Sequence, residues 1–230
     1  MNAYLVSCLI PAYNAARFIT ETLDSIVAQT HRPIEIVVVD DGSTDATADV
    51  VRHHDAEITL VEAEHAGLIP ARDAAIEAAT GDWIAFCDAD DLWVPDKLRR
   101  QLAVFESDPD VDVCVGQYLN FWDEEAAQEA ERYAGQPLSE PISGWIVPTM
   151  LARREVFERY GRFGDAIRPS DTGWFATAVE RGCLVETLEQ VVMHRRVHTT
   201  NDSLTGEDPL GGLFDLIKIR ADARRGRIDR

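Results

Sequence analysis

The alternation of strand and helix signals in the first half of the chain constrains the fold more than any other feature. Short apolar runs at 4–10, 34–39, 58–61 and 83–87 predict buried strands. The segments between these runs carry apolar residues at helical spacing, which predicts helices at 14–29, 46–53 and 68–79. This rhythm predicts an α/β fold with a parallel sheet and helical crossovers. Ligands of such sheets bind at the carboxyl ends of the strands.

The ends of the predicted helices carry recognisable signals. Asn14 is a candidate N-cap for the first helix. Pro95 suits the first position of a further helix that continues to Phe105.

The second half of the chain is less regular, and we divide the chain near Gly116. The resulting regions, 1–115, 116–205 and 206–230, are expected to form one compact body. An acidic stretch at 123–132 and a proline-containing stretch at 135–144 suggest a surface excursion. The remaining predicted elements are a strand at 111–115, helices at 153–160, 171–181 and 210–223, and a β-rich segment at 184–197.

Three carboxylates, Asp88, Asp90 and Asp91, directly follow the strand at 83–87. Packing does not require three acids there, and their repulsion is unfavourable unless a cation is bound. An Asp-x-Asp turn can present oxygens to Mg²⁺ or Mn²⁺, which then bridges the phosphates of a nucleotide. The alternative is a solvated loop in which Asp91 or Asp96 caps the next helix. The motif alone does not decide between them, because Asp-x-Asp is common by chance.

Polar and aromatic residues near other strand ends favour the nucleotide interpretation. Tyr13 follows the first strand and can lie along a base, and Asp41 follows the second and can accept a base or ribose hydrogen. Arg72 lies on the helix before the acidic turn and can contact an anion. Taken singly, these are more often a packed aromatic, a turn residue and a surface charge. Together with the acidic turn they indicate a nucleotide site.

Four segments carry a resemblance to a known family. Residues 6–14, 36–45, 66–72 and 85–98 resemble the family 2 glycosyltransferases, in order and over nearly all of 4–105. The resemblance implies a GT-A fold, a Rossmann-like and mostly parallel sheet flanked by helices with a smaller acceptor-side region. It also implies transfer of a hexosyl-type sugar from a nucleoside-diphosphate sugar, dependence on Mn²⁺ or Mg²⁺, and inversion at the anomeric carbon. A UDP-sugar is the default donor, with GDP and dTDP open.

The resemblance also implies roles for individual residues. It makes 1–115 the donor half, in which Asp88 contacts ribose and metal and Asp90 is preferred as the direct metal ligand. The residues expected to hold the donor are Pro11, Ala12, Tyr13, Asp40, Asp41, Ser43 and Arg72.

The region 116–205 resembles the acceptor half of the family more weakly. Residues 150–163 are similar to the helix before the catalytic segment, and Asp171 falls where the family carries its general base. The resemblance implies that Asp171 takes the proton from the acceptor hydroxyl, a step that a carboxylate can perform. The alternative is that Asp171 only caps the helix that follows it, and both roles are compatible.

The segment 194–198 resembles the closing strand of the family with its Arg-x-His pattern. His198 is a candidate contact for the metal or the diphosphate, and Arg196 a candidate to balance charge on the leaving group. The alternative is a basic strand edge that neutralises nearby acids.

Three positions depart from the family pattern. Asp73 stands where asparagine is usual, Ser170 where glutamate is usual, and Gly173 where a polar or acidic residue is common. They motivate an alternative function, a nucleotide-sugar-binding protein with reduced or no transferase activity. A sugar nucleotidyltransferase is disfavoured because 11–14 stands where those enzymes carry a Gly-rich phosphate loop. The absence of Gly-x-Gly-x-x-Gly after the first strand argues against a dinucleotide oxidoreductase.

Composition limits the partners. The 22 basic and 41 acidic residues give a net charge of −19, which repels nucleic acids and anionic lipids at long range. No apolar run approaches the roughly 20 residues of a membrane span, and we expect no signal peptide. The four cysteines stand singly in apolar stretches, which favours reduced, buried thiols and a cytoplasmic location. The acceptor is left open among saccharides, lipid-linked intermediates, peptides and small metabolites, and the helix at 210–223 is a candidate dimer contact.

Overall fold

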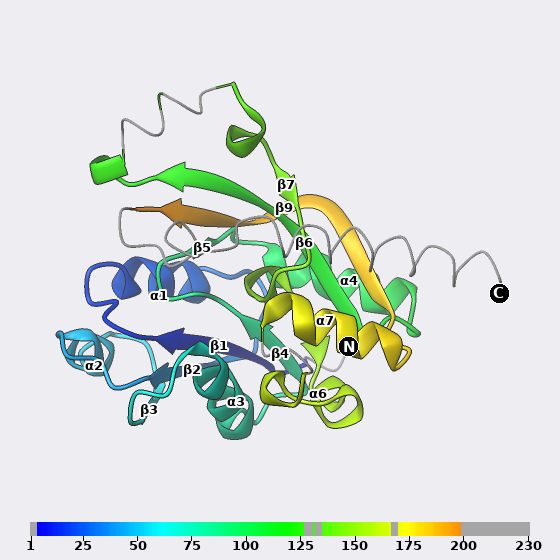
Figure 1. Cartoon of the computed structure of the whole chain (residues 1–230), viewed down its shortest axis with the longest axis horizontal. Coiled ribbons are helices and arrows are strands. Elements are labelled where there is room, and N and C mark those ends of the chain that lie inside the picture. Colours follow the sequence, from blue (N-terminus) through cyan, green and yellow to red (C-terminus); the bar gives the residue numbers. More distant parts are fainter. Residues whose placement is uncertain (1–3, 127–130, 132–134, 167–169, 199–230) are drawn as a thin grey trace.

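The structure, a computed structural model, describes residues 4–126, 131, 135–166 and 170–198. Nine strands form one curled sheet with helices on both faces (Figure 1). The strands are β1 (Val6–Ala12), β2 (Ile34–Asp40), β3 (Thr59–Glu62), β4 (Trp83–Phe86), β5 (Leu92–Trp93), β6 (Val113–Trp122), β7 (Ile142–Ser143), β8 (Leu151–Arg153) and β9 (Val185–Val197).

The helices alternate with the strands through β4, as the periodicity predicts. The α-helices are α1 (Ile19–Val27), α2 (Thr47–Arg52), α3 (Leu68–Ala78), α4 (Lys97–Ser107), α6 (Glu155–Tyr160) and α7 (Asp171–Glu180). Short 3₁₀ helices are η1 (Glu124–Ala126), η2 (Pro137–Ser139), η3 (Val147–Thr149) and η4 (Phe163–Asp165). None of the helices among the described residues has both the length and the apolar character needed to cross a bilayer.

The strand order is β3-β2-β1-β4-β8-β6-β9-β5, with β7 paired to β6. The four strands from β3 to β4 are all parallel, which confirms the parallel sheet predicted for the first half. The other half of the sheet is mixed, because β8 runs antiparallel to both β4 and β6 while β6 and β9 are parallel. The α/β sheet flanked by helices is thereby confirmed, with more antiparallel pairing than the sequence predicted.

Side chains of β1 alternate between two hydrophobic cores, one on each face of the sheet. Leu9 packs with α3, α6 and α7 on one face. Cys8 and Ile10 pack with α1 and α4 on the other. A strand covered on both faces is apolar throughout rather than alternating, which is why its sequence signal is a continuous apolar run. All four cysteines are buried and unpaired, as predicted.

Several predicted boundaries were wrong in an informative way. Helix α1 begins at Ile19, so Asn14 is not its N-cap. Asn14 instead has a φ of 50°, and its side-chain oxygen accepts a hydrogen bond of 2.8 Å from the backbone N–H of Thr44. It therefore joins the loops after β1 and β2. Helix α4 begins at Lys97, two residues beyond Pro95.

Strand β1 continues through Pro11 and Ala12, which the sequence placed after the strand. Pro11 has no N–H to donate, yet it pairs in register with Val39 of β2. The pairing of β1 with β4 ends at Leu9. At Pro11 there is therefore no strand on the β4 side with which a backbone N–H would form a hydrogen bond. The strand can therefore extend along β2 alone toward the cavity described below.

Strand β6 runs without a break through Gly116, where the sequence analysis divided the chain. The two halves thus share a strand instead of meeting at a linker. The helix predicted at 210–223, and with it the region 206–230, lies outside the described residues.

Candidate functional site

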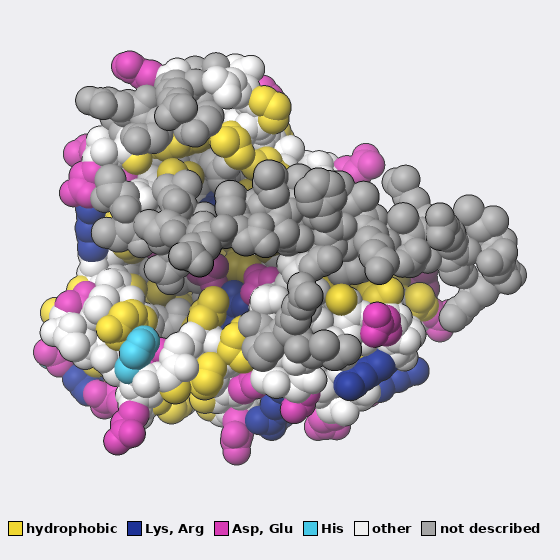
Figure 2. All heavy atoms as spheres, in the orientation of Figure 1, with side chains coloured by type: hydrophobic (Ala, Val, Ile, Leu, Met, Phe, Trp, Pro, Cys, Tyr) yellow, Lys and Arg dark blue, Asp and Glu magenta, His cyan; other side chains and the backbone are white. Residues whose placement is uncertain are grey.

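A cavity of about 850 Å³ opens at the carboxyl ends of β1 and β4. The molecular surface is hollowed there, and acidic and basic side chains lie among hydrophobic ones (Figure 2). Its volume falls within the range of small-molecule sites. The cavity is lined by Pro11, Ala12, Tyr13, Asn14, Ala15, Phe18, Asp41, His65, Gly67, Leu68, Ala71, Arg72, Asp88, Ala89, Asp90, Asp91, Tyr118, Ile146, Pro148, Asp171, Arg195 and His198.

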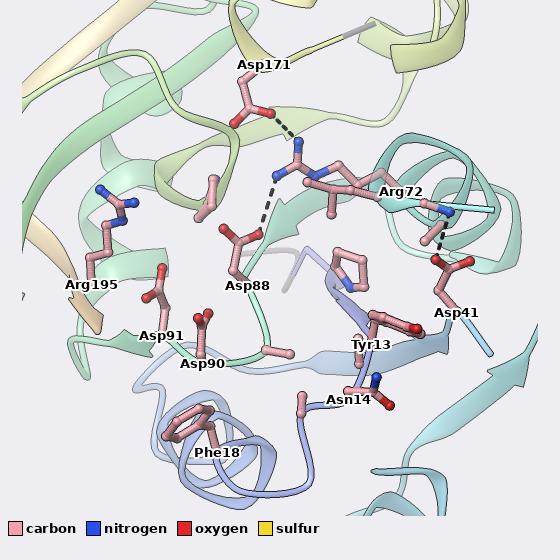
Figure 3. Close-up of a pocket in the computed structure, with 18 of the residues that line it drawn as sticks. Tyr13, Asn14, Phe18, Asp41, Arg72, Asp88, Asp90, Asp91, Asp171 and Arg195 are labelled. Carbon is pink, nitrogen blue, oxygen red and sulfur yellow. Dashed lines mark hydrogen bonds and ion pairs between the residues drawn. The ribbon is translucent and has the colours of Figure 1, made fainter. Parts of the chain in front are cut away.

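The acidic turn after β4 forms the floor of this cavity (Figure 3). The side chains of Asp88 and Asp90 are 38% and 26% exposed, so both carboxylates can reach a ligand. Asp91 is buried and accepts a 2.9 Å hydrogen bond from the backbone N–H of Arg196. Asp91 therefore ties the turn to β9, and it does not cap the next helix.

Burial and repulsion shift two of the acids of this turn, Asp88 and Asp91, toward their protonated forms. Although the side chain of Asp88 is partly exposed, desolvation by the surrounding protein, together with repulsion from Asp90 and Asp171, raises its pKa to about 6, and the charge of Arg72 opposes the shift. Burial and repulsion from its two neighbours also raise the pKa of Asp91 well above its ordinary value. Because neighbouring carboxylates repel one another when ionised, this turn favours the binding of a cation that would neutralise them.

Asp90 lies directly beside His198 in the wall of the cavity. Its Oδ2 lies 3.0 Å from Nε2 of His198, whose buried ring packs against Phe18 with centroids 4.6 Å apart. Carboxylate oxygen and imidazole nitrogen are both ligands that Mn²⁺ accepts. The described residues contain no group of three or more His, Cys, Asp or Glu side chains that could hold a metal by themselves. A cation at this turn would therefore need further ligands from a nucleotide and water.

An aromatic pair stands at the other end of the cavity. The ring of Tyr13, 47% exposed, stacks on that of His65 with centroids 4.1 Å apart and planes 21° apart. The sequence analysis missed His65, because it inspected the ends of the first, second and fourth strands and not the loop after β3. That loop begins at the carboxyl end of β3, at the same edge of the parallel sheet, and this position was the available signal.

Asp41 anchors that loop instead of projecting into open space. Its two carboxylate oxygens accept 2.8 Å hydrogen bonds from the backbone N–H groups of Ala66 and Gly67. Nδ1 of His65 also lies 2.8 Å from Oδ2 of Asp41. Asp41 is only 4% exposed, so it mainly fixes the loop that carries His65.

Arg72 and Asp171 come together from opposite halves of the chain. The guanidinium of Arg72 forms an ion pair with Oδ1 of Asp171 and lies 3.4 Å from Oδ1 of Asp88 (Figure 3). Asp171 is the first residue of α7, and its side chain is 28% exposed. The helix is capped by Ser170, whose hydroxyl accepts a 3.0 Å hydrogen bond from the N–H of Gly173. Asp171 is therefore not the cap, and its carboxylate is available to the cavity.

Three residues expected to hold the donor do not line the cavity. Asp40 and Ser43 hydrogen-bond each other within the turn after β2. The guanidinium of Arg196 is buried and pairs with Glu21 at 2.7 Å and with the backbone oxygen of Asp90 at 2.9 Å. The alternation of β9 directs Arg195 toward the cavity instead. The structure therefore gives these three residues contacts within the protein and no place in the lining of the cavity, and their direct contact with a donor stays a prediction.

The departures at positions 73, 170 and 173 have structural reasons. Asp73 does not line the cavity, and its carboxylate accepts 2.9 Å hydrogen bonds from the N–H groups of Phe163 and Gly164 in η4. Ser170 and Gly173 form the N-terminal cap of α7. None of the three adds charge to the cavity.

Comparisons with known proteins identify the family of the chain. Residues 7–170 match the model of Glycosyl transferase family 2. The chain belongs to this family. It is therefore a transferase enzyme with the GT-A type of fold.

Three proteins illustrate the family relationship. An uncharacterised glycosyltransferase of Nostoc is 31% identical over 87% of this chain and 67% of its own length. A UDP-Glc:alpha-D-GlcNAc-diphosphoundecaprenol beta-1,3-glucosyltransferase of Escherichia coli is 40% identical over 45% of this chain and 42% of its own length. The solved structure of a mannosyltransferase from Pyrobaculum calidifontis, in complex with GDP-Man and Mn²⁺, superposes with a TM-score of 0.65 at 28% identity. That likeness covers 87% of this chain and 59% of the mannosyltransferase. The chain thus matches only part of the length of each relative.

Proposed function

We propose that this chain is an inverting, metal-dependent glycosyltransferase that moves a sugar from a nucleoside-diphosphate sugar to an acceptor hydroxyl. The observation that carries the proposal is that one cavity is bordered by the acidic turn, by the aromatic pair and by Asp171. These are the three parts that the reaction needs. The acidic turn offers a place for the diphosphate, the aromatic pair offers a surface for the nucleobase, and Asp171 can act as the general base.

The donor is assigned to the cavity between the aromatic pair and the acidic turn. The exposed ring of Tyr13 offers a flat surface on which a nucleobase can stack. Pro11 and Ala12, at the end of β1, also line the cavity. We retain a UDP-sugar as the first candidate. The Escherichia coli relative is named for UDP-Glc, whereas the Pyrobaculum structure holds GDP-Man, so a GDP-sugar is the second.

Asp90 is the proposed metal ligand, with Asp88 and His198 as neighbours that complete one side of the site. Their oxygen and nitrogen atoms fit Mn²⁺ or Mg²⁺, and repulsion among the acids gives a cation a reason to bind. The ion would supply electrostatic stabilisation of the departing diphosphate. The Pyrobaculum complex with Mn²⁺ supports this assignment.

Asp171 is the proposed general base. Its carboxylate reaches the cavity beside Pro148, and Ile146 and Tyr118 extend the wall beyond it. An acceptor lying against these residues would present its hydroxyl to Asp171, on the side of the sugar opposite the diphosphate. The identity of the acceptor, a homodimer and a cytoplasmic location remain predictions of the sequence.

The donor and the metal can be tested together by thermal unfolding. UDP-glucose, UDP-N-acetylglucosamine and GDP-mannose are each added with Mn²⁺, and one nucleotide type should raise Tm more than the others. EDTA, or the substitution Asp90→Ala, should remove most of this shift because the diphosphate then loses its bridging cation. An equal shift with and without Mn²⁺ would contradict metal dependence.

The general base is tested with Asp171→Asn, which keeps the size of the side chain and removes its basicity. Sugar transfer, or hydrolysis of the selected donor by water, should fall by about 10²- to 10⁴-fold, the usual range for loss of a general base. Nucleotide binding measured by calorimetry should stay unchanged. Retention of the wild-type rate would refute the assignment, and a complete absence of turnover in the wild-type protein would favour the binding-protein alternative.

A further inference from the structure

Arg72 occupies an unusual position for a residue that the sequence assigned to the nucleoside. It projects from α3, in the first half of the chain, and its guanidinium reaches Asp171 at the start of α7 in the second half. Figure 3 shows the guanidinium pointing between Asp171 and Asp88. It thus joins the proposed base to the acidic turn.

The burial of Arg72 leaves little of it for a ligand. The side chain is 1% exposed, and its two terminal nitrogens face Asp171 and Asp88. The side chain of Asp171 is 28% exposed. Of Arg72 and Asp171, only Asp171 therefore offers an open surface to an acceptor.

The carboxylate of Asp171 is held from two directions. Oδ1 accepts from Arg72, and Oδ2 accepts a 3.1 Å hydrogen bond from the backbone N–H of Val147 at the start of η3. A carboxylate has about four lone-pair sites, so two sites remain for the proton of an acceptor hydroxyl. The two contacts fix the orientation of the Asp171 carboxylate and still leave it able to accept a further hydrogen bond.

Arg72 is itself held rigidly. Its guanidinium lies over the ring of Phe163, 5.5 Å from the centroid, and Phe163 packs against Phe157 and Trp174 in the core. A planar guanidinium that is stacked and forked toward two carboxylates keeps its direction, whereas a lysine ammonium acts as a flexible point charge. The orientation of Asp171 and Asp88 thus depends on the planar shape of the Arg72 guanidinium as well as on its charge.

We infer that Arg72 is a positioning residue for the general base. It fixes the carboxylate of Asp171 toward the acceptor side of the cavity and couples it to Asp88, and it does not hold the nucleoside. The inference rests on the proposed function, because it takes Asp171 to be the base.

A double-mutant cycle tests this inference. The set comprises Arg72→Met, Asp171→Asn, the double variant and Arg72→Lys, with Arg153→Met as the matched control. Arg153 also lies over an aromatic ring, that of Trp83 at 4.7 Å, but it does not line the cavity. Each variant is assayed for hydrolysis of the donor selected above and for calorimetric binding of UDP and of GDP with Mn²⁺.

The expected pattern is specific to a residue that acts through another. Arg72→Met should lower kcat by about 10²-fold, the loss typical of a misplaced catalytic group, with KM and nucleotide binding within about threefold of the wild type. The double variant should be no slower than Asp171→Asn alone. Arg72→Lys should restore part of the rate, and Arg153→Met should match the wild type.

Other results would overturn the inference. Tenfold weaker binding of UDP or GDP in Arg72→Met would assign Arg72 to the nucleotide. Losses that multiply in the double variant would make the two residues independent. If Arg72→Met has the wild-type rate while Asp171→Asn is inactive, the positioning role of Arg72 is rejected and the proposed function stands. If Asp171→Asn has the wild-type rate, the proposed function is rejected as well. If Arg72→Met does not fold, Arg72→Lys and its double variant with Asp171→Asn complete the cycle.

Discussion

Asp73 illustrates at the scale of one residue how a departure from a family pattern acquires a structural reason. An asparagine has one acceptor oxygen in its side chain, whereas a carboxylate has two. Asp73 uses both, since Oδ1 and Oδ2 accept from the N–H groups of Phe163 and Gly164. The carboxylate of Asp73 therefore holds η4 in place, and η4 carries Phe163, whose ring lies against the guanidinium of Arg72.

The substitution Asp73→Asn should destabilise the protein without weakening nucleotide binding. The amide group would face a backbone N–H and leave it unsatisfied, at a cost of about 1–3 kcal/mol. Chemical denaturation measures the loss, and calorimetry with UDP or GDP and Mn²⁺ measures the binding. Tighter nucleotide binding in the variant would instead mean that the charge of Asp73 acts on the donor site.

At the scale of elements, the paired strands β6 and β9 contribute Tyr118 and Arg195 to the lining of the cavity. Their pairing has a register shift between Val115 and Gln117, at Gly116. A Cβ added at Gly116 would lie 2.5 Å from a methyl group of Val192, so the two strands can approach only because this position has no side chain. The shift matters for the site because β9 carries Arg195 and β6 carries Tyr118.

Gly116→Ala should lower the free energy of unfolding by about 1–3 kcal/mol, the typical cost of overpacking. Val192 is buried and stiff at χ1, so it cannot move aside easily. The double variant with Val192→Ala removes the clashing methyl groups and should be more stable than the sum of the two single changes predicts. Strict additivity in denaturation experiments would show that the contact is not the cause.

At the scale of the whole molecule, Lys97 lies where the two halves of the sheet join. It is fully buried on α4, and Nζ donates to Gln101 at 2.7 Å and to the carbonyl oxygens of Thr149 and Met150 at 3.2 Å. Burial lowers the pKa of Lys97 to about 7. Burial also raises the pKa of Cys8 to about 12, so that thiol stays protonated.

The lowered pKa of Lys97 predicts a stability that changes with pH in a definite direction. Between about pH 7 and the ordinary lysine pKa of 10.5, the unfolded chain binds a proton that the folded chain does not. Stability should therefore rise with pH in this window, by up to about 1.4 kcal/mol per pH unit, and show no such slope below pH 7. The difference between the wild type and Lys97→Met, measured by denaturation at several pH values, isolates this slope. A difference that stays constant from pH 6 to 10 would contradict it.

The sequence by itself determined the parallel strands through β4, the helices between them, the acidic turn and the place of Asp171 at the start of a helix. These are properties of short segments, because burial on both faces makes a strand continuously apolar and carboxylates after such a strand must lie at its end. Asp41 and Tyr13 were found at the cavity for the same reason.

Only the tertiary structure decided which groups face one another. The pairing of Arg72 with Asp171 joins residues 99 positions apart, and the stacking of His65 on Tyr13 joins two loops. The choice of Arg195 over Arg196 at the cavity depends on which face of β9 is turned toward it. Such relations arise when distant segments pack together, and no local pattern contains that information.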